Sequence, residues 1–571
     1  MPVKNITTEF GHSMPPEGKH NITVHFPGWK VITDFRDGDT SILPKLVSMY
    51  PRFAIGKKLE LPDTVGVLMY TSPDAFSVHQ EYAASSHRKK EDKLAEGDLG
   101  FKVAEINDIR LYIVTYPTAK GKGIIGAWQN PGIGTSTRTA EYLLGHIDSF
   151  KQVEWSGDLN ELPPPTYLPE NESHGKLRER ISSLMHRAPI DPDRVKVTPD
   201  DVYLYVSGMA AIYHLNKALL KRQSGTILVL GAIFHNTWHL FEETSGGVKH
   251  FGDCSATSGV LDKVEEYLET ERKNGRKISY AFTEFPSNPI CVSVDLKRLR
   301  QLADKYDFPI VADDTVGSFC NLDFMPVADM VMTSLTKSFS GYANVMGGSV
   351  VLNPDSPRYG EIKPHFTSDY RNEYFANDAD VLLSNSADYI PRSIILNRNA
   401  ATLAALLQKE TDDPTSPVTG SLYPPHNDTF DNYKALMRRT TPEFTPGYGC
   451  LLSVDFEDLE TAIAFYDNLA FYCGPHLGAH LSLANAFNTA VYGKVREEAK
   501  YHASYGLREE QVRLAVGLED EEELVDTVNF ALQKAREAKE AKKASGGSKA
   551  VENENAEVVA TTVEVSADAE G

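Results

Sequence analysis

Apolar residues in the middle of the chain follow two spacings that alternate with each other. Short and nearly continuous apolar runs, such as "DVYLYV" and "TILVLGAIF", are followed by segments such as "AAIYHLNKALLKR", in which apolar residues recur every three or four positions. The first spacing is typical of buried strands, and the second of helices packed against a sheet. Because this alternation runs from "HGKLRERISSLMHRA" to about residue 353, it predicts a mainly parallel α/β sheet covered by helices.

The pattern changes on either side of this region and predicts five segments. Residues 1–60 mix short strand-like pieces with turns and are expected to form an N-terminal arm. Residues 61–165 have an alternation of their own, as in "DIRLYIVTYPT", and are expected to be an insertion. Residues 166–355 form the large domain, and residues 356–540 a smaller α+β C-terminal domain. Residues 541–571 are polar, acidic and poor in aromatics, so we expect a disordered tail.

Composition and charge exclude several classes of protein. A chain of 571 residues can form two or three domains with sizeable cores. The net charge of −21 argues against nucleic acid and anionic membranes as partners, because both require a basic surface. The five cysteines are scattered and lack metal-binding spacing, which is typical of reduced thiols in a cytoplasmic protein. No apolar run approaches the roughly 18 residues of a membrane span, and the first residues lack the apolar core of a signal peptide.

Two further stretches contain histidine or glycine at spacings found in ligand sites. His235 and His239 have a spacing suited to zinc, but no carboxylate or cysteine completes a ligand set, so we expect no metal. In "NPGIGTSTRTAEYLL", residues 130–144, a Gly-x-Gly precedes a helical pattern. It lacks a third glycine and a preceding βαβ unit, so an ordinary helix N-cap is the favoured interpretation over an anion site.

Chemically distinctive residues follow the predicted strands of the large domain, one group after each strand. Open α/β sheets bind ligands beyond the carboxyl ends of their strands, so these groups are expected to lie at one edge. They comprise helix-start amides suited to an anion, an aromatic ring, an amide, a carboxylate and hydroxyls beside a lysine. The residues are Gly208 and Met209, Phe234, Asn288, Asp313, and Ser334, Thr336 and Lys337.

Lys337 stands between two apolar runs, in "TSLTKSFSGYANVMGG". Taken alone, this lysine could extend its ammonium to water, or it could be a desolvated amine that attacks a carbonyl group. The full set of strand-end groups suits pyridoxal phosphate, whose aldehyde requires a lysine. Its phosphate requires several neutral donors, its ring nitrogen a carboxylate, and its ring face an aromatic side chain.

The chain resembles the pyridoxal-phosphate-dependent transsulfuration enzymes of cysteine and methionine metabolism, and most closely the fungal-type cystathionine γ-synthases. The matching stretches are "VSGMAAIY", "EFPSNP", "VADDT", "TSLTKSFSG" and "QVRLAVGLED". The resemblance implies an α/β protein of PLP fold type I (aspartate-aminotransferase-like), with a mainly parallel large-domain sheet and a smaller α+β C-terminal domain.

The resemblance also implies roles for individual residues. Lys337 would hold the cofactor covalently as the catalytic residue, Asp313 would pair with the ring nitrogen, and Phe234 would stack on the ring. The phosphate would be held by Gly208, Met209, Ser334 and Thr336. Arg513 would bind the substrate carboxylate, with Asn288 and Ser482 beside it.

A phosphate clamp from a neighbouring subunit is a further implication. Two candidates compete for it: Tyr50 with Arg52 in "YPRF", which is the favoured assignment, and Tyr167 in "TYLPEN", which lacks a matching arginine. We therefore expect a homodimer or homotetramer with shared active sites.

The implied activity is that of a cystathionine γ-synthase, which joins an O-acyl-L-homoserine, acetyl or succinyl, to L-cysteine. Three departures from the family pattern bear on it: Phe234 replaces a tyrosine, Asp314 an asparagine, and Leu481 in "PHLGAHLSL" an acid that faces the distal substrate. A cystathionine β- or γ-lyase, an O-acylhomoserine sulfhydrylase and a catalytically weak scaffold therefore stay open as alternatives.

Overall fold

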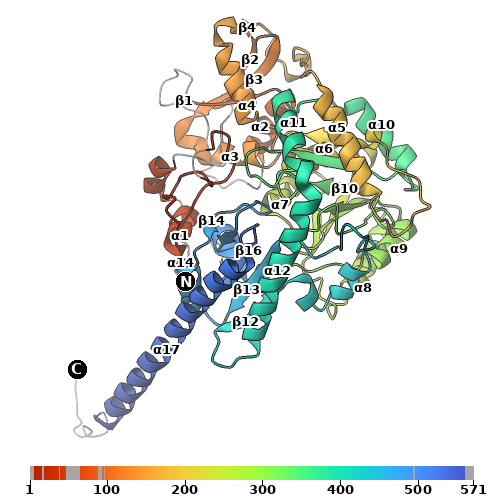
Figure 1. The fold of residues 1–571 in the computed structure, drawn as a ribbon. Coiled ribbons are helices and arrows are strands. Elements are labelled where there is room, and N and C mark those ends of the chain that lie inside the picture. The colour runs from red at the N-terminus through yellow and green to blue at the C-terminus, as the bar shows by residue number, and fades with distance from the viewer. Residues whose placement is uncertain are drawn as a thin grey trace, which may run out of the picture.

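The computed structural model describes residues 6–15, 18–37, 39–46, 65–85, 87, 93–95, 97–166, 168–492 and 496–559. Within these ranges the strands form three sheets, which belong to successive parts of the chain. Figure 1 shows these parts of the chain, coloured from red at the N-terminus to blue at the C-terminus. The long C-terminal helix α17 (Glu521–Val559) projects away from the body.

The large domain is built on a seven-stranded sheet with the order β5-β11-β10-β9-β8-β6-β7. Neighbouring strands from β10 to β7 are parallel, while β11 runs antiparallel to both β10 and β5. The mainly parallel α/β sheet expected from the sequence is therefore confirmed. The strands are β5 (Val202–Tyr205), β6 (Thr226–Leu230), β7 (Val248–Phe251), β8 (Ile278–Glu284), β9 (Ile310–Asp313), β10 (Met330–Thr333) and β11 (Gly348–Leu352).

Helices cover this sheet, so its central strands are buried on both faces. Every residue of β8, β9, β10 and β11 is buried, which explains why these strands appear in the sequence as continuous apolar runs. The helices of this region are α5 (Glu172–Met185), α6 (Gly208–Arg222), α7 (His235–Glu242), α8 (Val260–Lys273), α9 (Leu296–Tyr306), α10 (Tyr359–Asp369) and α11 (Ala376–Asn385).

The C-terminal domain has a five-stranded sheet with the order β12-β13-β16-β15-β14. Its strands are β12 (Val418–Leu422), β13 (Leu451–Phe456), β14 (Tyr472–Cys473), β15 (Leu483–Asn485) and β16 (Gln511–Ala515). Its helices are α12 (Tyr389–Thr411), α13 (Phe430–Lys434), α14 (Leu459–Asn468), α15 (Phe487–Tyr492), α16 (Arg496–Ala503) and α17. Helix α17 continues into the segment expected to be a disordered tail from residue 541, whose Ala, Glu and Lys residues favour helix; residues 560–571 lie outside the described residues.

The expected insertion forms an antiparallel sheet of its own, with the order β1-β3-β2-β4. Its elements are β1 (Val65–Tyr70), α2 (Asp74–Ala84), β2 (Gly100–Ile106), β3 (Ile109–Pro117), α3 (Gly121–Gln129), α4 (Thr137–Gly145) and β4 (Lys151–Val153). Ser136 caps α4 by accepting from the amide of Thr139, so the Gly-x-Gly stretch does precede an ordinary helix N-cap. The stretch also packs on the large domain, because Ser207 Oγ donates to the carbonyl of Gly132 at 2.8 Å.

The N-terminal segment links the two larger domains. The amide of Ile22 donates to the carbonyl of Ala343, in the loop that follows Lys337. Farther along, helix α1 (Trp29–Asp37) packs on the C-terminal domain, where the amide of Trp29 donates to Asp467 Oδ1 at 2.7 Å. The first part of the chain is thus bound to the body on both sides of the predicted site.

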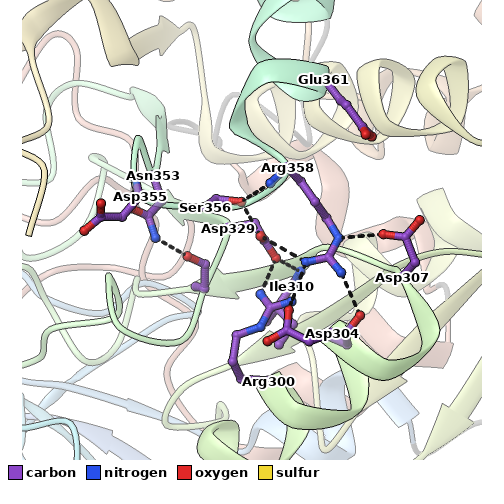
Figure 2. A network of polar contacts seen from close by, with 12 residues as sticks. Arg300, Asp304, Asp307, Ile310, Asp329, Asn353, Asp355, Ser356, Arg358 and Glu361 are labelled. Carbon is purple, nitrogen blue, oxygen red and sulfur yellow. Dashed lines mark hydrogen bonds and ion pairs between the residues drawn. The ribbon is translucent and has the colours of Figure 1, made fainter.

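A buried polar network anchors the amino ends of β9 and β10 (Figure 2). Its centre is Asp329, whose Oδ2 accepts from Arg300 Nη1 at 2.7 Å and from the amide of Ile310 at 2.6 Å. The other carboxyl oxygen of Asp329, Oδ1, accepts from the hydroxyl of Ser356 and lies 3.7 Å from Arg358 Nη1. Because the side chain of Asp329 is fully buried, this network fixes the two strands whose opposite ends carry Asp313 and Lys337.

Candidate active site

The carboxyl ends of the parallel strands place the predicted residues at one edge of the sheet. Asp313 ends β9, and it is the register partner of Glu284 at the end of β8 and of Met332 in β10. Lys337 follows β10 by four residues, and its amide donates to the carbonyl of Ser334 in a tight turn. The strands therefore bring the carboxylate and the lysine together although 24 residues separate them in the chain.

A cavity at this edge contains most of the residues expected from the sequence. Its wall combines residues of the large domain with Arg513 and a loop of the C-terminal domain. The lining residues are Gly208, Met209, Ile212, Phe234, Thr237, Glu284, Asn288, Asp313, Thr315, Val316, Met332, Ser334, Lys337, Pro475, Leu477 and Arg513.

One end of the cavity is suited to an anion. Helix α6 begins there at Gly208, capped by Ser207, which accepts from the amide of Ala210 at 3.0 Å. The first amides of a helix have no partner within it and carry partial positive charge. A Cβ on Gly208 would lie 2.7 Å from Ser334 Cβ, so only glycine permits this close approach of the helix to the lysine turn.

Two predicted residues use their hydroxyls elsewhere and do not line the cavity. Thr336 Oγ1 donates to the carbonyl of Gly347 and accepts from its amide, both at 3.1 Å. Ser482 Oγ donates to Glu519 Oε2 at 2.8 Å and accepts from the amide of Gly517 at 2.9 Å. Both hydroxyls stabilise loops that frame the site, a use that short sequence motifs do not reveal.

At the other end, two carboxyl groups lie side by side. Burial raises the pKa of Asp313 to about 6, although the amide of Thr315 donates to its Oδ1 at 2.9 Å. Burial and the charge of Asp313 raise the pKa of Glu284 well above its ordinary value. Two such groups resist carrying two negative charges at once, so the pair disfavours the doubly ionised state. Glu284 was missed in the sequence, although it ends a strand within the quoted "EFPSNP".

The neighbouring Asp314 does not line the cavity. It is 1% exposed, and burial raises its pKa well above the ordinary value. Its Oδ1 lacks a hydrogen-bond partner within the described part of the chain. Asp313 and Asp314 thus occupy different environments, because successive residues at the end of a strand point to opposite sides.

Arg513 enters from β16 as a buried cation. Its Nη1 donates to Asn288 Oδ1 at 3.2 Å, and its Nη2 donates to the carbonyls of Pro475 and His476 at 2.7 and 3.1 Å. Burial lowers its pKa to about 10, so the guanidinium stays charged at neutral pH. In the described part of the chain, no carboxylate is among the groups that shift its pKa, and its Nε lacks a hydrogen-bond partner.

Lys337 contacts a residue to which the sequence had not assigned this position. Its Nζ lies 3.3 Å from Nδ1 of His476, which is fully buried in the loop between β14 and β15. From the same loop, Leu481 packs into an apolar cluster with Leu477, Ala479 and other buried residues. Leu481 is therefore a core residue in this structure and does not face the cavity.

A second, more apolar cavity of about 210 Å³ adjoins the first at Phe234, Lys337 and Pro475. Apolar side chains from α1 and the C-terminal domain dominate its wall. The remaining lining residues are Phe26, Ile32, Phe35, Gln129, His235, Asn236, Gly474, Asn485, Phe487, Ala490 and Val491.

The predicted phosphate clamp cannot be placed. Tyr50, Arg52 and Tyr167 all lie outside the described residues, so both assignments stay predictions. In the parts of the chain that the structure does describe, no group of three or more His, Cys, Asp or Glu side chains could hold a metal ion. The helices among those parts include none long and apolar enough to cross a membrane.

Comparison with known proteins identifies the family. Residues 198–533 match the family model for Cys/Met metabolism PLP-dependent enzymes. The chain belongs to this family. The alanine racemase ungC of Aspergillus violaceofuscus is 35% identical over 445 residues, covering 74% of each chain. The cystathionine γ-synthase-like protein ankD of Aspergillus thermomutatus is 31% identical over 558 residues, covering 92% of this chain and 94% of that one.

Solved structures agree on the fold of this Cys/Met metabolism enzyme. The cystathionine γ-synthase of Xanthomonas oryzae pv. oryzae, in complex with aminoacrylate and cysteine, superposes with a TM-score of 0.52 at 21% identity. The match covers 64% of this chain and 87% of that one. The fold is PLP fold type I, and the cofactor of the family is pyridoxal phosphate, as the resemblance implied.

The residues present suit that cofactor. The cavity has a helix start for a phosphate, a buried carboxylate for a ring nitrogen and a lysine for an aldehyde, with Phe234 beside them. The close approach of Gly208 to Ser334 leaves backbone amides accessible to an anion where a Cβ would fill the space.

Proposed function

We propose that this chain is a transferase of the cystathionine γ-synthase type, which joins an O-acyl-L-homoserine, acetyl or succinyl, to L-cysteine and forms L-cystathionine. The observation that carries the proposal is the buried guanidinium of Arg513 on the wall of the cavity that Lys337 lines. A buried cation is costly without an anionic partner. The α-carboxylate of an amino-acid substrate supplies that partner through two parallel hydrogen bonds.

The cofactor and the chain have separate tasks in this reaction. Pyridoxal phosphate, when bound, supplies an aldehyde and a protonated ring that takes up electrons released at the substrate carbons. Gly208, Met209 and Ser334 would hold its phosphate, Asp313 its ring nitrogen and Phe234 its ring face. The raised pKa of Glu284 beside Asp313 disfavours a second negative charge at that end of the cavity.

Lys337 carries the protons, because Phe234 has no hydroxyl to exchange one. With the substrate carboxylate on Arg513, the lysine amine moves the α-proton and then a β-proton away from the substrate carbons. The γ-acyloxy group leaves as a carboxylate, and the sulfur of cysteine bonds to Cγ as the thiol proton is released. Protons then return to Cβ and Cα, which completes the product. The adjoining 210 Å³ cavity offers room for the distal part of the substrates.

A second candidate is amino-acid racemisation, favoured by the 35% identity to a relative named alanine racemase. The same two residues would serve it, with Arg513 holding the carboxylate and Lys337 removing and returning the α-proton. Racemisation differs in keeping the bonds at Cβ and Cγ intact, so a single product analysis separates the two reactions.

The experiment incubates the holoenzyme with O-acetyl- or O-succinyl-homoserine plus cysteine or sulfide, and separately with L-alanine in D2O. Cystathionine as the main product supports the proposal, while homocysteine indicates a sulfhydrylase. 2-Oxobutanoate or pyruvate from cystathionine alone indicates a lyase. Formation of D-alanine with deuterium at Cα indicates a racemase, and no turnover by protein loaded with cofactor would indicate a scaffold.

Arg513→Lys tests whether Arg513 binds the α-carboxylate of the substrate, whichever of these reactions the enzyme catalyses. Lysine keeps the charge but loses the planar fork, so KM for the amino-acid substrate should rise while the cofactor absorbance stays unchanged. An unchanged KM would place the carboxylate elsewhere.

A further inference from the structure

His476 contacts both functional cations of the site, through different atoms. Its side-chain Nδ1 lies 3.3 Å from Lys337 Nζ, and its main-chain carbonyl accepts from Arg513 Nη2 at 3.1 Å. The residue is fully buried in the loop between β14 and β15. One residue of the C-terminal domain therefore touches the lysine of the large domain and the arginine that faces it.

The protonation of the imidazole decides what it can do. Burial and the charges of Lys337, Arg513 and His480 lower the pKa of His476 well below its ordinary value. These are the charged and titratable groups that act on it, and none is a carboxylate. The ring is therefore neutral at neutral pH, and such a ring is a poor acceptor of a proton from an alkylammonium.

The contact also sets the tautomer. Lysine nitrogen donates and has no acceptor role when charged, so Nδ1 of His476 is the acceptor and Nε2 carries the hydrogen. Nε2 lacks a hydrogen-bond partner among the residues that the structure describes. The ring thus offers the lone pair of Nδ1 to Lys337. The buried Nε2–H of His476 is left without a partner among the described residues, which is unfavourable for stability.

We propose that His476 is a positioning residue for Lys337: its neutral Nδ1 holds one N–H of the lysine amine, while its carbonyl holds Arg513. The amine that moves protons and the guanidinium that binds the carboxylate then keep a defined separation. The inference rests on the cofactor chemistry of Lys337 and not on which substrate the enzyme uses.

Three substitutions separate positioning from packing. In His476→Asn the amide oxygen can replace Nδ1, whereas in His476→Gln it extends to the place of Nε2, and His476→Phe keeps a ring without an acceptor. His426→Asn is the matched control, because its Nδ1 lies 3.0 Å from Ser421 Oγ, in a contact outside both cavities.

The first readout needs no substrate. Cofactor-free protein is mixed with pyridoxal phosphate, and the rate of covalent attachment to Lys337 is followed by absorbance from pH 6 to 9. The Phe and Gln variants should attach the cofactor about tenfold to a hundredfold more slowly, with a shifted pH profile, because misorientation of a reacting group has effects of this order. The Asn variant should stay within about threefold of wild type, as should His426→Asn.

The second readout is steady-state kinetics with whichever substrate is turned over. The loss in the Phe and Gln variants should appear in kcat, with KM changed less than about threefold, because the amine acts after binding. Thermal unfolding midpoints identify any variant that is merely misfolded. If His476→Phe does not fold, the Asn and Gln pair still decides.

Equal attachment rates and kcat for the Asn and Gln variants would overturn the proposal, as would a Phe variant that matches wild type. Failure of the transferase assignment is a separate outcome, because it changes the products but not the attachment rate.

Discussion

The buried carboxylate of Asp313 is predicted to make the cofactor-free protein less stable, so that Asp313→Asn raises its free energy of unfolding. Burial raises the pKa of this carboxyl from 3.8 to about 6. A rise of about two pH units corresponds to about 3 kcal/mol at about 1.4 kcal/mol per unit. Asparagine is neutral, and its Oδ1 can still accept from the amide of Thr315, which lies 2.9 Å from Oδ1 in the structure.

The sign of the pH dependence follows from which state loses its proton first. As the pH rises above 3.8 the unfolded chain releases this proton, while the folded chain keeps it until about pH 6. Between these two pH values the native state binds more protons than the unfolded state, so the free energy of unfolding falls as the pH rises. Above about pH 6 the contribution of this group no longer changes with pH. The variant's advantage should therefore be about 3 kcal/mol at pH 7.5 and about half of that at pH 5.

Urea unfolding of cofactor-free wild type, Asp313→Asn and Asp314→Asn at both pH values measures this difference. Asp314→Asn is the comparison at a second buried carboxyl. Because burial raises the pKa of Asp314 well above its ordinary value, the same linkage predicts that its replacement also raises stability at pH 7.5. The two variants should differ in the holoenzyme, where Asp313→Asn lowers turnover far more than Asp314→Asn. Equal midpoints for wild type and Asp313→Asn at pH 7.5, or an advantage that grows as the pH falls, would refute the reasoning.

Three further outcomes are expected. Lys337→Ala should abolish the absorbance of covalently bound cofactor together with turnover, whereas a wild-type protein that stays colourless with pyridoxal phosphate would contradict the assignment. Asp329→Ala should lower the free energy of unfolding by about 3–5 kcal/mol, because it leaves buried arginine unpaired; Lys305→Ala, at an exposed ion pair, should cost at most about 1 kcal/mol by the same denaturation assay. Inactive Lys337→Ala mixed with inactive Arg52→Ala should regain partial activity in hybrid oligomers, and no recovery despite subunit exchange would direct the search for the clamp to Tyr167.

The sequence by itself determined the class of fold and the centre of the site. Buried parallel strands require continuous apolar runs, and the helices on them require apolar residues at every third or fourth position, so the large domain could be recognised from spacing alone. Asp313 and Lys337 were found because ligand sites follow the ends of such strands. Arg513 came from the resemblance to a family, since nothing in its local pattern distinguishes it from a structural arginine.

Only the tertiary structure decided which polar atoms face the cavity. Thr336 and Ser482 have the residue types that the motif requires, but their hydroxyls are bound to Gly347 and Glu519. His476 lies 139 residues from Lys337 in the chain, and the two meet because the loop between β14 and β15 folds against the large domain. Such contacts depend on how separate domains pack, and short-range patterns of hydrophobic and polar residues do not encode that packing.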